Sequence, residues 1–544
     1  GSQAFPLCRG GGHPDKARGS HVWLHSQGVV YGGVEAKAGV GEPAEDDDMP
    51  REHDHKLKLV SLPFVSTSHL IPVVDIARLF AIHGVDVTII TTTATAAIFQ
   101  SSIDRDRDRG HAIRTHVVKF PCEQVGLPEG VESFNSNTPR DLVPKIYQGL
   151  TILQDQYQQL FHDLQPDFLF TDMFYPWTVD AAAKLGIPRL IYVSGGYLAH
   201  SSQNTIEQFS PHTKVDSDTE SFLLPGLPHE LKMTRLQLPD WLRAPTGYTY
   251  LMNMMKDSER KSYGSLLNTF YELEGDYEEH YKKAMGTKSW SVGPVSFWVN
   301  QDALDKADRG HAKEEQGEGE EGWLTWLDSK TENSVLYVSF GSMNKFPTPQ
   351  LVEIAHALED SDHDFIWVVR KKGESEDGEG NDFLQEFDKR VKASNKGYLI
   401  WGWAPQLLIL EHHAIGAVVT HCGWNTIIES VNAGLPMATW PLFAEQFYNE
   451  KLLAEVLRIG VPVGAKEWRN WNEFGDEVVK REEIGNAIGV LMGGEESIEM
   501  RRRAKALSDA AKKAIQVGGS SHNNLKELIQ ELKSLKLQKA NHKS

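Results

Sequence analysis

Residues 403–446 read WAPQLLILEHHAIGAVVTHCGWNTIIESVNAGLPMATWPLFAEQ. An apolar run, 414–419, precedes the turn HCGWNT, and apolar residues with helical spacing follow over 427–433. This order predicts a buried strand, a turn and a helix. A helix N-terminus favours negative charge, because its free N–H groups and its dipole both point outward there. The stretch therefore predicts an α/β protein with an anion site at this turn.

The residue types within the turn suit a phosphorylated ligand. His421 can add a hydrogen-bond donor, and Gly423 lets the backbone approach closely. Glu429 follows Asn425 by four residues, so both side chains project from one face of the predicted helix. A carboxylate acceptor so placed suits a pair of ribose hydroxyls.

This stretch resembles the signature box of plant family-1 UDP-sugar glycosyltransferases, and it has the family length of 44 residues. A core of packed tryptophans alone would not require His, Asn, Glu and Gln at these intervals. The positions that match the family are Trp403, Ala404, Pro405, Gln406, His421, Gly423, Trp424, Asn425, Glu429, Gly434, Pro436, Trp440, Pro441, Glu445 and Gln446.

The resemblance implies a cradle for a UDP-sugar in the second half of the chain. Trp403, with Ala404 beside it, would stack on the uracil, and Gln406 and Glu429 would contact the ribose. The diphosphate would be held by Ser342, His421, Gly423, Asn425 and Thr426. The sugar would be faced by Trp424, Glu445 and Gln446. Thr426 replaces a serine that is frequent in the family, and it keeps the hydroxyl.

The first half of the chain opens with a strand–helix–strand pattern. LKLVSLPFV (57–65) and VDVTIITTT (85–93) predict strands, and apolar residues at helical spacing lie between them. His69 lies in the turn after the first strand, where open α/β sheets bind ligands. The family has a His, two residues and a Pro here, and HLIP (69–72) matches, although Ser68 stands where a Gly is common.

Asp172 ends a second predicted strand, 167–171. From the sequence alone it could be a helix N-cap. The resemblance implies that it pairs with His69, and the two roles are compatible. His69 would then remove the proton of an acceptor hydroxyl while Asp172 orients the imidazole, giving inversion at the anomeric carbon.

The composition excludes several classes of protein. A formal net charge of −19 argues against nucleic acid and anionic membranes as partners. Three cysteines are too few for a disulfide framework, and no apolar run reaches the ~18 residues of a membrane span. We expect a cytoplasmic monomer that uses a UDP-sugar as co-substrate, with no cofactor and no metal.

The resemblance covers roughly residues 57–537 and implies two doubly wound, Rossmann-like domains facing across a cleft, the GT-B architecture. We expect a leader or cloning-derived segment over 1–48, an acceptor-binding domain over 49–301 and an acidic linker or exposed loop over 302–322. A UDP-sugar-binding domain would occupy 323–522. A helix over 523–544 would cross back to the first domain.

The stretches 62–81, 226–245, 337–346 and 460–475 resemble legume glycosyltransferases of oleanane triterpenoid saponins. They imply an acceptor such as soyasapogenol 3-O-glucuronide, glycosylated on its glucuronosyl unit, with a flavonoid as the alternative. Gln446 favours UDP-glucose, because an amide can donate to one equatorial hydroxyl and accept from the next. UDP-galactose and UDP-glucuronate stay open as donors.

Two other classes of function stay open. A non-catalytic UDP-sugar-binding protein is one, although His69 and Asp172 argue against it. An NAD(P)-dependent oxidoreductase is the other, and the turn at Gly341 and Ser342, which follows a predicted strand, lacks the G-x-G-x-x-G fingerprint that this class carries between a strand and a helix.

Overall fold

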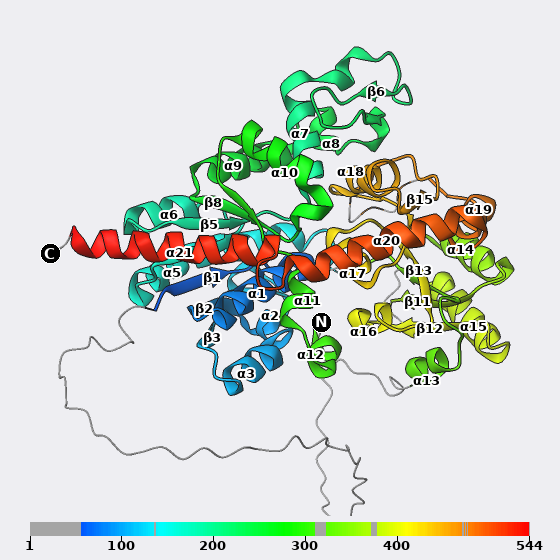
Figure 1. Cartoon of the computed structure of the whole chain (residues 1–544), viewed down its shortest axis with the longest axis horizontal. Coiled ribbons are helices and arrows are strands. Elements are labelled where there is room, and N and C mark those ends of the chain that lie inside the picture. The colour runs from blue at the N-terminus through cyan, green and yellow to red at the C-terminus, as the bar shows by residue number, and fades with distance from the viewer. Residues whose placement is uncertain are drawn as a thin grey trace, which may run out of the picture. The chain divides into compact units, whose positions relative to one another are not determined.

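The computed structural model describes residues 56–134, 138–310, 322–370, 378–470, 473, 475 and 477–542. The expected leader, 1–48, lies outside these residues. Two parallel sheets with flanking helices dominate the described chain (Figure 1). Within the described residues no helix is long and apolar enough to cross a membrane.

The first sheet has seven parallel strands in the order β3-β2-β1-β4-β5-β8-β9. Its strands are β1 Lys58–Leu62, β2 Asp86–Thr92, β3 Ile113–Val118, β4 Phe168–Asp172, β5 Arg189–Tyr192, β8 Gly264–Leu267 and β9 Ser289–Ser291. Chain order reverses between β1 and β4, which pair directly. From β1 the chain continues toward one edge of the sheet, and from β4 it continues toward the other edge. Ligands are expected at the carboxyl ends of the two strands where the order reverses.

The helices of this half are α1 Thr67–Ile82, α2 Thr93–Ala97, α3 Gln100–Asp108, α4 Cys122–Val125, α5 Val143–Leu164, α6 Thr178–Leu185, α7 Tyr197–Phe209, α8 Asp240–Arg243, α9 Gly247–Lys261, α10 Tyr271–Met285 and α11 Val295–Val299. Short 3-10 turns, η2 Pro211–Lys214 and η3 Arg235–Gln237, flank the hairpin of β6 Phe222–Leu223 and β7 Lys232–Met233. The first strand–helix–strand unit is therefore confirmed as β1, α1 and β2.

The second sheet has six parallel strands in the order β12-β11-β10-β13-β14-β15. Its strands are β10 Val335–Ser339, β11 Asp364–Val369, β12 Gly397–Trp401, β13 Ile415–Thr420, β14 Met437–Thr439 and β15 Gly460–Pro462. All six residues of β13 are buried, as a strand covered on both faces requires. The chain order reverses between β10 and β13, again at a pair of adjacent strands.

The helices of this half are α12 Ala303–Asp308, α13 Gly322–Asp328, α14 Thr348–Asp360, α15 Gly378–Ala393, α16 Gln406–Leu410, α17 Trp424–Ala433, α18 Gln446–Lys451, η5 Leu452–Val456, α19 Arg481–Met492, α20 Gly494–Ala514 and α21 Ser520–Asn541. Together the two sheets confirm the expected pair of Rossmann-like units.

The last helix, α21, is drawn in red in Figure 1 and packs on the first sheet. Leu525, Leu528, Ile529 and Leu532 are buried in the same apolar cluster as α1 and β1. Polar contacts extend this packing, since the Lys536 ammonium donates to the Lys56 carbonyl at 2.7 Å. A helix that follows the second sheet in the chain is therefore part of the first sheet's core.

The expected linker, 302–322, differs from a solvated loop in its described part. Residues 303–308 form α12, whose N-cap Asp302 accepts from the backbone N–H of Asp305 at 2.8 Å. Asp305 is buried and pairs with Arg105 at 2.6 Å and Arg109 at 2.9 Å. The run was expected to be an exposed loop, but the acidic residues of its described part, Asp302, Asp305 and Asp308, pair with arginines of α3 and the residue following that helix. Residues 311–321 lie outside the described chain.

Candidate active site

His69 and Asp172 meet at the carboxyl ends of two adjacent strands. His69 is the third residue of α1, directly after β1, and Asp172 is the last residue of β4. Nδ1 of His69 lies 2.9 Å from Oδ2 of Asp172. Because a carboxylate only accepts, Nδ1 carries the hydrogen and Nε2 is left to accept a proton. Asp172 is fully buried, and its Oδ1 accepts from the Phe174 N–H at 2.9 Å, which fixes its orientation.

The electrostatic surroundings favour the charged form of His69. Burial lowers its pKa, but the charge of Asp172, the hydrogen bond to Asp172 and the charge of Glu445 together raise it above the ordinary value of 6.5. Asp172 thus stabilises the imidazolium that would form on proton uptake. Glu445 belongs to the second half of the chain, so both halves contribute to this charge balance.

Aromatic side chains surround the imidazole. Phe174 meets it edge-on with ring centroids 5.0 Å apart, and Phe64 and Tyr192 do so at 6.0 and 6.2 Å. Phe64 and Phe174 also stack on each other at 4.7 Å. The base therefore lies beside an apolar wall, which suits a hydrophobic acceptor better than a free sugar.

The anion-binding turn forms where the sequence predicts it. Gly423 is the N-cap of α17, and His421 lies between β13 and that helix. A Cβ at Gly341 would lie 2.6 Å from Cε1 of His421, and one at Gly423 would collide with the same ring. These glycines make room for the imidazole. Ser342 follows Gly341 in the turn after β10, so the turns of the two adjacent strands lie together.

His421 is neutral in this setting. Burial lowers its pKa to about 4, against the opposing effect of the Ser339 backbone. Its ring can therefore offer one N–H to an anion, without a net charge. Asn425, at the first turn of α17, donates from Nδ2 to the Ser68 carbonyl at 2.9 Å, next to His69. The expected diphosphate site thus contacts the residue that precedes the expected base.

The side chains expected to hold the ribose form one network. Gln406 donates from Nε2 to Glu429 Oε2 at 2.6 Å and to Thr426 Oγ1 at 3.4 Å. Its Oε1 accepts from the Tyr337 hydroxyl at 3.1 Å. Glu429 also accepts from Nη1 of Arg309 at 2.7 Å. The sequence does not identify Arg309 as a site residue, because it lies in the charged stretch 302–322 and no motif there distinguishes it.

Two residues expected at the sugar, Trp424 and Gln446, make contacts within the protein that the sequence did not predict. The indole of Trp424 is buried and donates from Nε1 to the Asn268 carbonyl at 2.9 Å, so its ring faces the first half of the chain. The Gln446 amide oxygen accepts from the N–H groups of Leu442 at 2.9 Å and Phe443 at 3.0 Å.

The contacts of Gln446 correct the argument for glucose. That argument required a free amide oxygen and a free amide nitrogen, and the oxygen is committed to closing its own loop. Only Nε2 remains as a donor. Glu445 is held at 3.3 Å from Nδ2 of Asn449, and burial raises its pKa despite the opposing effects of its own backbone, His69 and Asn449. Ala404 is buried, and the ring of Trp403 lies against Gly310, the residue after Arg309.

A histidine–aspartate pair on one Rossmann-like sheet and a helix N-terminus that follows a strand of the other form the arrangement expected of a nucleotide-sugar glycosyltransferase. The UDP-glucoronosyl and UDP-glucosyl transferase family matches residues 245–462. A soyasapogenol B glucuronide galactosyltransferase of Glycine max is 69% identical over 485 residues, 89% of this chain and 97% of that protein. This chain belongs to that family and is a UDP-glycosyltransferase.

Two further comparisons agree in fold and family. The UDP-glucosyl transferase 73DL1 of Saponaria officinalis is 44% identical over 91% of this chain and 99% of its own. The crystal structure of Glycyrrhiza uralensis UGT73P12 complexed with glycyrrhetinic acid 3-O-monoglucuronide is 71% identical, with a TM-score of 0.86 over 90% of this chain and 98% of that one. The expected GT-B fold and the triterpenoid relatives are confirmed.

Proposed function

We propose that this enzyme transfers a hexosyl unit from a UDP-sugar, with inversion, to the glucuronosyl unit of an oleanane triterpenoid glucuronide. The observation that carries the proposal is the His69–Asp172 pair, 2.9 Å apart, with Nε2 of His69 left free beside the anion-binding turn. A non-catalytic UDP-sugar-binding protein has no need for this pair, so the geometry favours an enzyme.

The proposed reaction has one displacement step. Nε2 of His69 takes the proton of an acceptor hydroxyl as that oxygen attacks the anomeric carbon. The bond from this carbon to the diphosphate oxygen breaks on the opposite face, so the configuration inverts. Asp172 holds the resulting imidazolium, as the carboxylate of a hydrolase triad does. The proton leaves His69 later, when products depart.

The leaving UDP gains negative charge, which the cradle can stabilise. The N-terminus of α17, the ring N–H of His421 and the hydroxyls of Ser342 and Thr426 are the donors for the diphosphate. Glu429 and Gln406 hold the ribose hydroxyls, and Trp403 stacks on the uracil. Trp424, Glu445 and Gln446 lie at the sugar end.

For the donor sugar we propose UDP-galactose. The 69% identical relative is named a galactosyltransferase, and the contacts of Gln446 remove the reason to expect glucose. UDP-glucose is the second candidate, because the 44% identical Saponaria relative is named a glucosyl transferase. With only Nε2 free, Gln446 can donate to one hydroxyl and cannot accept from its neighbour.

For the acceptor we propose a soyasapogenol 3-O-glucuronide. The support is the name of the 69% identical relative and the monoglucuronide in the 71% identical structure, together with the aromatic wall at His69. The domain boundaries given above, the monomeric state and the cytoplasmic location remain part of the proposal.

One experiment tests both substrates. Purified enzyme is given UDP-galactose, UDP-glucose or UDP-glucuronate at equal concentration, with soyasapogenol B 3-O-glucuronide or a flavonoid, and products are read by mass spectrometry. We expect a hexose added to the triterpenoid glucuronide, fastest from UDP-galactose. Faster transfer from UDP-glucose would favour the second donor, and transfer to the flavonoid alone would overturn the acceptor.

A further inference from the structure

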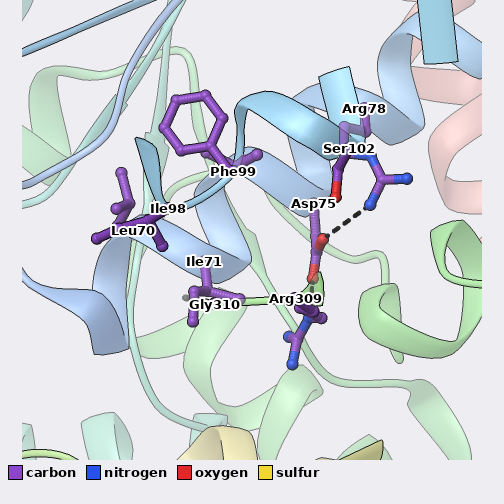
Figure 2. A pocket seen from close by; sticks show the side chains of 10 residues that line it. Leu70, Ile71, Asp75, Arg78, Ile98, Phe99, Ser102, Arg309 and Gly310 are labelled. Atoms are coloured by element: carbon purple, nitrogen blue, oxygen red, sulfur yellow. Dashed lines mark hydrogen bonds and ion pairs between the residues drawn. The ribbon is translucent and has the colours of Figure 1, made fainter. Parts of the chain in front are cut away.

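Arg309 joins the two halves of the chain at the nucleotide cradle. It follows α12 and is 11% exposed. Its Nε donates to Asp75 Oδ2 of α1 at 2.9 Å, and its Nη1 donates to Glu429 Oε1 of α17 at 2.7 Å. Figure 2 shows Asp75 between Arg78 and Arg309, with Gly310 and Ile71 beside them. A buried guanidinium thus sits between two carboxylates, one from each half.

Gly310, the residue after Arg309, lies against the ring of Trp403. Its φ of +91° is in the left-handed region. A Cβ on this residue would collide with the ring of Trp403 and would lie 2.7 Å from Cδ1 of Ile71. The bare backbone of Gly310 therefore fills the space between the Trp403 ring and α1.

Both contacts fall on residues that the proposed function assigns to the nucleoside. Trp403 is the proposed uracil platform, and Glu429 is the proposed acceptor of the ribose hydroxyls. The Glu429 carboxylate already receives Arg309 on one oxygen and Gln406 on the other. A ribose that approaches Glu429 must share or replace these donors, and a uracil that approaches Trp403 meets Gly310.

We propose that Arg309 and Gly310 determine the affinity for the donor, because they occupy the nucleoside end of the cradle and a UDP-sugar binds by displacing them. This inference rests on the proposed function. Asp75 makes the displacement feasible, since Arg309 keeps one buried carboxylate as partner when Glu429 turns to the ribose. An uncompensated buried charge, which would be far more costly, is thereby avoided.

If Arg309 occludes the cradle, its removal should strengthen UDP binding, whereas removal of an arginine that binds UDP directly would weaken it. If only a fraction of the enzyme has an open cradle, the apparent Kd for UDP equals the intrinsic Kd divided by that fraction. Weakening the contact between Arg309 and Glu429 raises the fraction of enzyme whose cradle is open. A loss of a direct contact to UDP would instead weaken binding.

The test is isothermal titration of UDP into the full chain. We expect Arg309→Gln to bind UDP roughly three- to tenfold more tightly than the unmutated enzyme. Gly310→Ala, which retains the charge but forces the segment away from Trp403, should tighten binding in the same direction. Lys306→Ala is the matched control, since Lys306 is in α12 and pairs at 2.6 Å with Glu411, outside the cradle.

Unchanged or weaker UDP binding by folded Arg309→Gln would overturn the proposal. Circular dichroism melting establishes that each variant is folded. Arg309→Lys replaces the Gln variant if that one is not folded. The Lys variant should tighten binding less, because it keeps the positive charge on one nitrogen but cannot span Asp75 and Glu429 as the guanidinium does. Failure of the proposed function looks different. In that case the unmutated enzyme does not bind UDP, and His421→Ala changes nothing.

Discussion

At the scale of single residues, the environment of His69 predicts a specific pH profile. A general base works only when deprotonated, and the pKa of His69 is raised above 6.5 by Asp172 and Glu445, against burial. We therefore expect kcat/KM to fall as the pH drops through a value above 6.5. His69→Ala should lower transfer by about 10²–10⁴-fold while UDP binding is kept.

The variant Asp172→Asn separates the effects of Asp172 on rate and on pKa. It removes the charge that raises the pKa of His69, so the acidic limb of the profile should move to lower pH while the plateau falls less than in His69→Ala. Rates measured between pH 5 and 9 test this. An acidic limb that stays in place would contradict the pairing as the cause of the shift.

The cradle residues predict effects on binding rather than on proton transfer. His421→Ala and Glu429→Ala should each weaken UDP binding by about 1–3 kcal/mol, the cost of losing one charged or buried hydrogen bond. Titration calorimetry with UDP measures this directly. If both variants bind UDP as well as the unmutated enzyme does, the anion-binding turn does not face the nucleotide.

Individual residues also show which parts of the candidate site could be predicted from the sequence. His69, Asp172, His421 and Glu429 could be predicted, because each occupies a fixed position in a strand–turn–helix pattern. Arg309 could not, since its partner Glu429 is 120 residues away and only the tertiary fold brings them together. The contacts of the Gln446 oxygen were missed for another reason: Gln446 begins α18, and spacing does not show that its side chain turns back to the loop before the helix.

At the scale of elements, the loop 440–445 between β14 and α18 places the residues at the sugar end. Ala444 has a φ of +51°, in the left-handed region, which costs a non-glycine residue free energy. Its carbonyl accepts from Nε1 of Trp468 at 3.1 Å, and the Leu442 carbonyl accepts from the Arg469 N–H at 2.9 Å. The segment after β15 therefore holds this loop in shape.

This support predicts that Trp468 positions the donor sugar. Trp468→Phe keeps an aromatic ring but removes the donor to Ala444, so the ratio of kcat/KM for UDP-galactose and UDP-glucose should change by roughly threefold or more. The Kd for UDP should not change. Trp401→Phe is the control, because it removes an indole bond of 3.0 Å to Asp388, away from the loop. An unchanged sugar ratio would show that Trp468 only fills space.

At the scale of the whole molecule, the two sheets are joined by helices that follow one sheet and pack on the other. The resemblance predicted that the last helix, α21, returns to the first half of the chain. Contacts such as that of Lys539 with the Leu185 carbonyl, at 3.1 Å, tie the end of this helix to α6 in the first half. In the proposed function His69 belongs to the first half and the nucleotide cradle to the second half. Catalysis should therefore depend on the contacts between the halves, whereas nucleotide binding should depend mainly on the second half.

A pair of leucines on α21 tests this division. Leu528 is fully buried and Leu537 is 54% exposed. Leu528→Ala should lower the free energy of unfolding by about 2–5 kcal/mol, through lost burial and the cavity left behind, whereas Leu537→Ala should have little effect. Below the melting temperature, Leu528→Ala should keep its UDP affinity but lose transfer rate, because the loosened first half carries His69 while the cradle belongs to the second. Thermal melting, calorimetry and a transfer assay on both variants measure these quantities. Equal melting temperatures would contradict the packing of α21, and a parallel loss of UDP binding and transfer would contradict the division of labour between the two sheets.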